Sequence, residues 1–190
     1  GLEVIGDTVC SNSDSATVQI IGTKIAERYT AFLNSKAISD SVLSKGGIVK
    51  LRIAVADLKL DTNRIQIQSS IKGCGLSFLD KPAIVIVNRL PSADVAVIGD
   101  TVCSNETTAS IRIKKNEKAV TYTAYLNNKQ IGQAVKSVGG DTTIVIPVAD
   151  LQPDTNKIAI VATIDGCANV VLDDSAKVIL NIKPITTLDL

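Results

Sequence analysis

Three residue types are absent from this chain of 190 residues: histidine, methionine and tryptophan. Without histidine the chain cannot carry a Ser-His-Asp or Cys-His catalytic group, a histidine general base, or the histidine ligands of a typical catalytic zinc site. We therefore expect no enzyme activity and no cofactor. Without methionine the sequence does not begin as a complete translation product does, so we expect a processed chain or a piece of a longer one.

The chain also lacks an excess of positive or negative charge. Twenty basic and nineteen acidic residues leave a formal net charge of +1. This balance gives no electrostatic footprint for nucleic acid or for an anionic membrane surface. No apolar run is long enough to span a bilayer, so direct membrane insertion is not expected. Hydrophobic residues make up 45% of the chain, which is enough for a folded core and excludes a disordered segment.

What the chain does contain is one motif written twice. The segment Val4–Asn12 returns unchanged as Val97–Asn105, a shift of 93 positions. The alignment continues without a gap until Pro91 falls on Pro184. About 90 residues can bury a core unaided, so this period indicates tandem domains rather than the units of a solenoid.

The repeat sets the expected domain boundaries. We predict one domain at 1–90 and a second at 91–184. Residues 185–190 match the beginning of the second copy, and we expect them to open a further repeat or form a tail. The chain would then be a segment cut between the modules of an array.

Both copies have the alternation of apolar and polar residues that is typical of half-buried β-strands. The predicted strands in the two copies include Thr17–Ile20, Tyr29–Leu33, Leu51–Val55, Arg64–Gln68, Ala83–Val87, Ser110–Ile113 and Ala176–Leu180. Glycine pairs and Asp-Thr-Asn segments lie between them as turn signals. Six or seven short strands in 93 residues predict an all-β fold of two immunoglobulin-like or fibronectin-III-like sandwiches. Pro147 further predicts an edge or bulged strand, because proline cannot donate to a ladder.

The four cysteines occur once early and once late in each copy. Cys10 and Cys74 are 64 positions apart, and so are Cys103 and Cys167. Because each repeat should fold on its own, we predict one intradomain disulfide in each, Cys10–Cys74 and Cys103–Cys167. Close C-x-x-C spacing, which zinc or redox sites require, is absent. Structural disulfides indicate a secreted or surface-exposed protein.

Four aspartates are candidates for a calcium site. Asp57 and Asp61 bracket a loop of the first copy, and Asp150 and Asp154 bracket the same loop of the second. Calcium requires six to eight oxygen ligands, and the only additional ligand in sight is the amide of the following Asn63 or Asn156. Turn capping by these side chains is therefore favoured, and no metal site is predicted.

Two further features bear on function. Phe32 and Tyr125 occupy the same outward position in the two copies, and we consider them a candidate contact surface; packing against a neighbouring strand is the alternative. The predicted linker contains no glycine and is stiffened by Pro91. Its residues are Asn88, Arg89, Leu90, Pro91 and Ser92. Domains joined in this way are expected to form a semi-rigid stalk.

The motifs Asp-Thr-Val-Cys, Tyr-Thr-Ala-(Phe/Tyr)-Leu-Asn, Ala-Asp-Leu followed by Asp-Thr-Asn, and the late Gly-Cys recur in both copies. In these features the chain resembles the tandem domains of the SprB-type gliding-motility adhesins of Bacteroidetes and related repetitive surface proteins. The resemblance covers both copies. It implies a filament exported to the bacterial cell surface by the type IX pathway, associated with the outer membrane, moved by the gliding machinery and without catalytic residues.

Three functions follow as hypotheses. The first is a structural repeat segment of a filamentous adhesin, which projects a distal binding region and has neighbouring repeats of the same chain as its partners. The second is a binding module for surface polysaccharide or another protein. The third is an accessory segment of a secreted polysaccharide-degrading enzyme whose catalytic domain lies elsewhere in the parent.

Overall fold

A computed structural model describes residues 1–184, so the segment 185–190, predicted to open a further repeat or form a tail, lies outside the described residues. Within 1–184 the regular structure is β-strand, apart from two single-turn 3₁₀ helices, η1 (Val55–Asp57) and η2 (Val148–Asp150). None of the helices in this described part is long and apolar enough to cross a membrane. The all-β prediction is confirmed.

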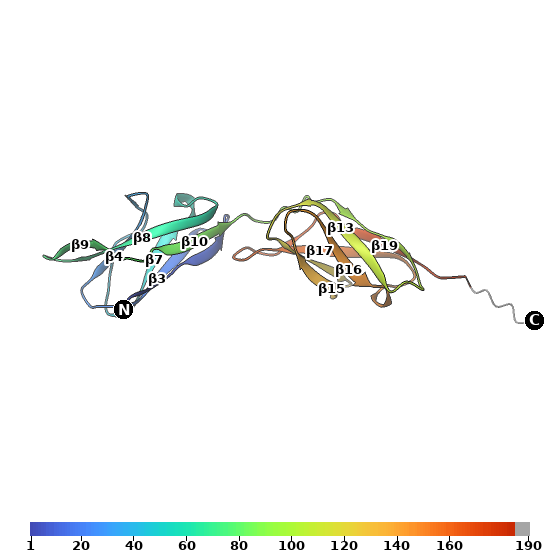
Figure 1. Ribbon diagram of the computed structural model, residues 1–190, viewed down its shortest axis with the longest axis horizontal. Helices are drawn as coiled ribbons and strands as arrows, with labels where there is room; N and C mark the ends of the chain where they lie inside the picture. The colour runs from blue at the N-terminus through green and yellow to red at the C-terminus, as the bar shows by residue number, and fades with distance from the viewer. Residues whose placement is uncertain (185–190) are drawn as a thin grey trace, which may run out of the picture. The chain divides into compact units, whose positions relative to one another are not determined.

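The first half of the chain forms two sheets around one core (Figure 1). The smaller sheet has the strand order β1 (Glu3–Ile5), β3 (Ser15–Thr23) and β7 (Gly47–Ala54). The larger sheet has the order β2 (Asp7–Cys10), β10 (Ala83–Asn88), β8 (Asp61–Ile71), β4 (Arg28–Leu33) and β5 (Lys36–Ala37). Two short strands extend it, β6 (Val42–Leu43) beside β4 and β9 (Gly75–Phe78) beside β8.

The second half repeats this arrangement. Its smaller sheet has the order β11 (Val97–Ile98), β13 (Thr108–Asn116) and β16 (Gly140–Pro147). Its larger sheet has the order β12 (Thr101–Cys103), β19 (Ala176–Asn181), β17 (Asp154–Thr163), β14 (Thr121–Leu126) and β15 (Lys129–Lys136), with β18 (Val170–Val171) beside β17. β16 is an edge strand and ends on Pro147, as the proline predicted.

The chain divides into two compact units, with the boundary between Leu90 and Pro91. Three residues of the second sequence repeat belong structurally to the first unit. Asp165–Cys167, which follow β17, belong to the first unit, while Pro91–Ile164 and the chain from Ala168 form the second.

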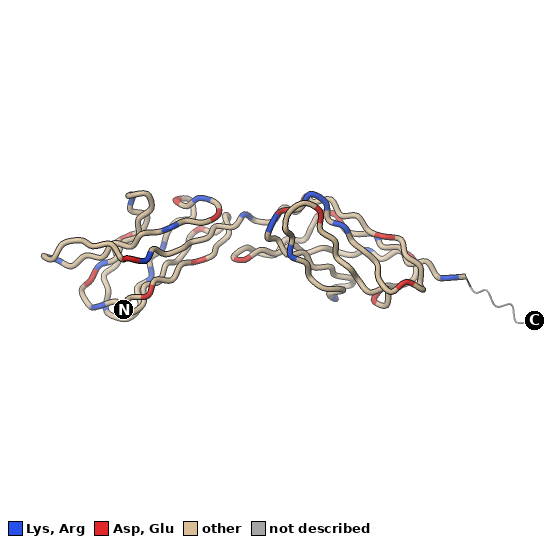
Figure 2. The backbone as a smooth tube through the Cα atoms, viewed as in Figure 1, with Lys and Arg blue, Asp and Glu red and all other residues tan. Residues whose placement is uncertain are grey.

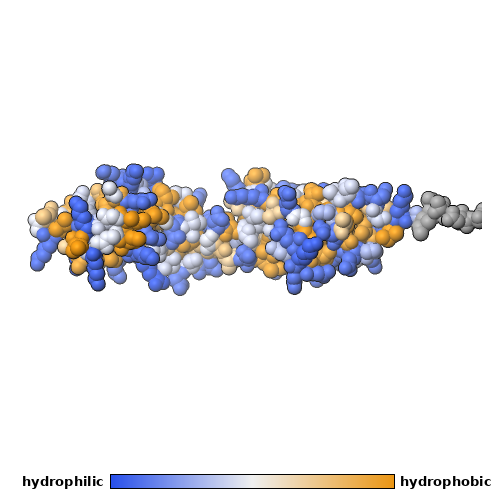
Figure 3. All heavy atoms as spheres, turned by 90° about the horizontal axis from the view of Figure 1, so that it is seen from below, coloured by the Kyte–Doolittle hydropathy of each residue, from blue (hydrophilic) through white to orange (hydrophobic). Residues whose placement is uncertain are grey.

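Each core is built by alternation along the strands. β7 has the burial pattern of a half-buried strand, in which Val49, Leu51 and Ile53 point inward and their neighbours are exposed. Tyr29 and Tyr122, which occupy the same position in the two repeats, are the largest fully buried side chains. Burial raises the pKa of both phenols. Basic and acidic residues are interspersed over both units, and apolar and polar residues are mixed on the face shown in Figure 3 (Figures 2 and 3).

Gly6 explains why Ile-Gly-Asp recurs. At this residue the first strand leaves the smaller sheet, where β1 pairs antiparallel with β3, and enters the larger one, where β2 pairs parallel with β10. The backbone passes so close to β10 that a Cβ on Gly6 would lie 1.7 Å from the carbonyl oxygen of Ile84. Gly99 has the same relation to Lys177, at 1.8 Å. Only glycine permits this approach.

Candidate functional site: the Cys10–Cys167 disulfide

The disulfide in this chain is not one of the predicted pairs. Cys10 is bonded to Cys167, with 4.6 Å between their Cα atoms and a sequence separation of 157. Cys74 is exposed and Cys103 half-buried, and both are free in the described structure. The predictions Cys10–Cys74 and Cys103–Cys167 are therefore wrong, and the bond links the first sequence repeat to the second.

The direction of β8 explains why the predicted pair cannot form. Cys10 lies opposite Asn88, the last residue of β10, and the adjacent Val87 lies opposite Asp61, the first residue of β8. Cys74 follows the other end of β8. The 11 residues of that strand span about 33 Å at roughly 3.3 Å per residue. A disulfide requires Cα atoms within about 7 Å.

The second repeat has the same geometry. Cys103 lies opposite Asn181 at the end of β19, beside the start of β17, and Cys167 follows the end of β17. The 10 residues of β17 place the two cysteines at opposite ends of their sandwich. In both repeats the early cysteine and the late cysteine therefore lie too far apart to form a disulfide with each other.

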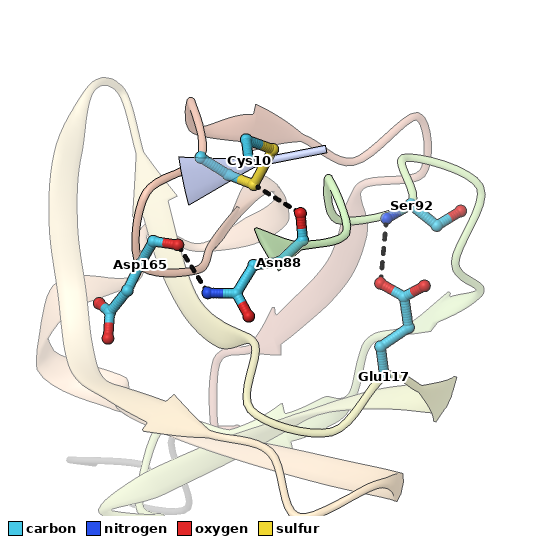
Figure 4. The surroundings of a disulfide bond; sticks show 6 residues. Cys10, Asn88, Ser92, Glu117 and Asp165 are labelled. Atoms are coloured by element: carbon cyan, nitrogen blue, oxygen red, sulfur yellow. Dashed lines mark hydrogen bonds between the residues drawn. A yellow bond between two sulfur atoms is a disulfide. The ribbon is translucent and has the colours of Figure 1, made fainter. Parts of the chain in front are cut away.

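We call Thr8, Val9, Cys10 and Asn88 the receiving edge, and Asp165–Cys167 the GC loop. The Asn88 side chain donates a hydrogen bond from Nδ2 to the carbonyl oxygen of Asp165, at 2.8 Å (Figure 4). The Asn88 carbonyl oxygen accepts a hydrogen bond from the backbone N–H of Ser11 at 2.7 Å. The Cys167 sulfur lies 3.7 Å from that oxygen, and because a disulfide sulfur carries no proton this is a packing contact.

Gly166 is required at this site for two reasons. Its φ of +76° lies in the left-handed region, which favours glycine. A Cβ there would also lie 2.5 Å from the Thr8 carbonyl oxygen and 2.9 Å from Val9 Cα, so the loop backbone packs directly on β2. The late Gly-Cys motif therefore combines a close-contact glycine with the bonded cysteine.

The receiving edge is covered. Cys10 is 2% exposed, whereas the equivalent Cys103 is half-buried. Closing a loop of 157 residues contributes about 5 kcal/mol in the chain-entropy model of disulfides. The bond is thus a major covalent constraint on a fold that is otherwise held by its two apolar cores.

The four candidate calcium ligands do not converge. Asp57 forms an exposed ion pair with Lys36 at 3.0 Å, and Asp150 pairs with Lys129 at 3.4 Å. Asp61 and Asp154 have positive φ angles of 74° and 78°, as turn residues do. In the part of the chain that is described, no group of three His, Cys, Asp or Glu side chains could hold a metal ion.

Asn63 and Asn156 cap these turns, as the favoured interpretation had it. The Asn63 side chain is 4% exposed; its Oδ1 accepts from the Lys59 N–H at 2.9 Å and its Nδ2 donates to the Lys59 carbonyl at 2.8 Å. Asn156 makes the same pair of bonds with Gln152, at 2.9 and 2.7 Å. These amides are committed to the backbone.

Phe32 lies half-buried on β4 and packs edge-to-face with Phe78 on β9, with 5.7 Å between the ring centroids. Tyr125, its counterpart on β14, is also half-buried. Packing against a neighbouring strand is thus realised for Phe32. A contact role for these two side chains remains a prediction.

The residues of the predicted linker, 88–92, belong partly to the first unit and partly to the second. Asn88 is the last residue of β10 and part of the receiving edge, whereas Pro91 is buried in the second unit. The backbone N–H of Ser92 donates to the Glu117 carboxylate at 3.3 Å (Figure 4). Sequence reasoning missed the role of Asn88, although an asparagine recurs at Asn181, where the same strand of the second repeat ends.

Comparisons with known proteins agree with this architecture. The family described as the second all-β domain of β-galactosidase matches residues 94–166, which is less than half of the chain. No curated protein matches.

Solved structures with a similar fold include a T cell receptor, titin domains and CNTN1 domains. A marsupial T cell receptor matches with a TM-score of 0.58 at 10% identity, covering 99% of this chain and 76% of that one. Titin domains I67–I69, in an E-to-A variant, give 0.55 at 14% identity, covering 95% and 64%. Chicken CNTN1 domains FN1–FN3 give 0.50 at 11% identity, covering 90% and 64%. The chain thus spans under two thirds of the titin fragment. These likenesses establish tandem immunoglobulin-like sandwiches.

Proposed function

We propose that this chain is a structural repeat segment of a filamentous adhesin at the bacterial cell surface, a semi-rigid stalk that projects a distal binding region and bears tension. The observation that carries the proposal is the Cys10–Cys167 bond, which covalently ties the first sequence repeat to the second. A crosslink of this kind has a clear use in a repeat protein that transmits force. It also fits an oxidising, extracellular setting.

Two further features support a stalk. The tandem sandwiches repeat one pattern of strands and turns, and basic and acidic residues are interspersed along the backbone of both units (Figure 2). The aromatic content is 3%, with no tryptophan, which leaves few platforms for stacking on sugar rings. Attachment to substrata and movement by the gliding machinery follow from the resemblance to the SprB-type repeats and belong to this proposal.

A glycan array separates the stalk from a binding module. The oxidised two-repeat protein should bind no sugar reproducibly, and a Phe32→Ala variant should behave in the same way. Reproducible binding by the wild-type chain that Phe32→Ala or Tyr125→Ala abolishes would replace the spacer with a recognition module. Small-angle scattering of the oxidised protein should give an elongated particle, and a compact pair of domains would contradict the stalk.

One observation favours a second candidate function. The match of residues 94–166 to an all-β domain of β-galactosidases suggests an accessory segment of a secreted polysaccharide-degrading enzyme. The sequence of the parent protein distinguishes the two. A catalytic domain beside two or three repeats supports the accessory role, whereas dozens of consecutive repeats support the adhesin.

A further inference from the structure

We propose that Cys103 and Cys74 are the two unjoined halves of the same disulfide that Cys10 and Cys167 form, and that each bonds to another repeat of this kind. The late cysteine of every repeat then bonds to the early cysteine of the repeat before it. Tandem repeats would be joined twice at each junction, once by the backbone and once by sulfur. The proposal deepens the stalk function and rests on it for the presence of further repeats.

The 93-residue equivalence supplies the first argument. Cys103 occupies the position of Cys10, and Cys74 that of Cys167. The bonded and the free pair therefore contain one cysteine of each type. A repeat cannot satisfy both of its own cysteines, because the length of β8 or β17 separates them.

The second repeat presents the receiving edge uncovered. Its residues are Thr101, Val102, Cys103 and Asn181. Thr101 and Asn181 are exposed, whereas their bonded counterparts Thr8 and Asn88 are half-buried. The backbone scaffold is the same, since the N–H of Ser104 donates to the Asn181 carbonyl at 2.8 Å, as Ser11 does to Asn88. Asn181 is thereby placed to donate its side-chain amide as Asn88 does.

The first repeat presents the complementary loop. Lys72, Gly73 and Cys74 are all exposed and form the turn between β8 and β9. Gly73 has a φ of +86°, close to the +76° of Gly166, but no atom lies within 4 Å of the position of its Cβ. A shallow groove beside this loop is lined by exposed apolar side chains, among them Leu43, Ile71 and Leu76. The loop therefore has its turn conformation in the described structure without a partner.

The bond forms by thiol–disulfide exchange with an oxidising disulfide, supplied by a small molecule such as oxidised glutathione or by an oxidase. The Cys103 thiolate attacks that disulfide, forms a mixed disulfide and releases one thiol. The thiolate of the incoming late cysteine then attacks the Cys103 sulfur and releases the second thiol. The two cysteines lose two protons and two electrons, and the oxidant becomes two thiols.

A three-repeat chain tests the proposal directly. Residues 98–184 are appended after Leu190, which keeps the 93-residue register because 185–190 match 92–97. After oxidation in a glutathione buffer, free thiols are alkylated and disulfide-linked peptides are identified by mass spectrometry. We expect Cys10–Cys167 as before and Cys103 bonded to the appended copy of Cys167. In dilute protein Cys74 and the appended Cys103 should be alkylated, and any bond between molecules should join these two to each other.

Two outcomes would overturn it. Either Cys103 and the appended copy of Cys167 are both alkylated in a folded chain, or Cys103 bonds to Cys167 and leaves Cys10 free. The matched control is Cys103→Ala in the three-repeat chain, which should convert the appended Cys167 into a free thiol and leave Cys10–Cys167 intact.

The natural two-repeat chain supplies a second test that needs no added repeat. A Cys74→Ala chain, which keeps Cys103, is mixed with a Cys103→Ala chain, which keeps Cys74, and both are oxidised together. We expect a disulfide-linked heterodimer through Cys103 and Cys74 as the product, without the homodimers that Cys103–Cys103 and Cys74–Cys74 bonds would give. Homodimers in the proportions of random pairing would refute a specific match. Both tests read covalent structure only, so glycan binding by the same protein would defeat the spacer function and leave this proposal standing.

Discussion

The Cys10–Cys167 bond predicts how far the chain can be stretched. The sequence separation of 157 positions, at roughly 3.5 Å per extended residue, corresponds to about 550 Å of chain. Pulled from its two ends, the oxidised protein can extend only through residues 1–10 and 167–190, which span at most about 120 Å at that rise per residue. The fully reduced chain can reach about 670 Å on the same scale.

Single-molecule force spectroscopy measures this difference. We expect the oxidised protein, in a Cys74→Ala/Cys103→Ala background that removes the free thiols, to show almost no gain in contour length when the sandwiches unfold. Addition of a reductant under load should then release about 550 Å in one step, because the loop between the bonded cysteines opens at once. Cys10→Ala is the matched control, and it should show the full extension without reductant.

The reasoning would be refuted by an oxidised chain that extends as far as the Cys10→Ala variant. That result would mean that the bond does not lie in the path of the load. In the oxidised chain that keeps all four cysteines, a release near 64 residues, or roughly 220 Å at the same rise per residue, would instead indicate that the cysteines of one repeat are paired.

Three other predictions concern single residues. Gly166→Ala should slow formation of the Cys10–Cys167 bond and lower its yield in a glutathione buffer, because the new Cβ meets the backbone of β2. The control is Gly73→Ala, at a position with a similar φ but with open space around the new Cβ. It should lower the free energy of unfolding in urea by only the left-handed strain of about 1–2 kcal/mol and leave the bond unchanged. Asn63→Ala should lower the free energy of unfolding in urea by about 3 kcal/mol, because it leaves buried polar groups of the backbone unpaired. The control Thr62→Ala, at an exposed neighbouring residue, should lower it by well under 1 kcal/mol. Equal losses in the two variants would contradict the capping role of Asn63. Burial tends to raise the pKa of Asp100, but hydrogen bonds from the Ser110 N–H and hydroxyl and from the Thr101 N–H outweigh it and hold that pKa below its usual value. The unfolded chain therefore binds this proton more readily, so Asp100 contributes stability above its unfolded pKa that is lost as pH falls through the lower folded pKa. Asp100→Asn should accordingly flatten the fall in stability between neutral and acidic pH in urea titrations, and an unchanged pH profile would argue against these bonds.

Much of the fold follows from local sequence. Alternation placed β3, β4, β7, β8 and β10 correctly, because each of these strands buries one face and exposes the other. Pro147 marked an edge strand for a reason that acts within one residue. Gly6 and Gly99 were visible as part of the repeat, but their role was not, since the close approach to β10 and β19 depends on which sheet each strand joins.

The disulfide could not be predicted in the same way. Duplication favoured pairing within a repeat, and that argument treats the two ends of a sandwich as equivalent. The end at which a cysteine lies depends on the direction of the strand beside it, and β8 carries Cys74 away from Cys10. The four strands predicted between these cysteines would return the chain to the end where Cys10 lies. The short strands β5 and β6, which were not predicted, both run antiparallel to β4 and add a further reversal. The close contact between Gly166 and Thr8 is long-range in sequence and leaves no local pattern.

The bond between residues 10 and 167 also changes what a protease can achieve. A single cut anywhere from Ser11 to Gly166, including the segment that joins the two repeats, leaves the two ends of the chain attached through sulfur. The nicked protein would run as one species without reductant and as two fragments with it. A surface filament built on this plan would keep its outer portion after such a cut, and would shed it only when a cleavage and a reduction occur together.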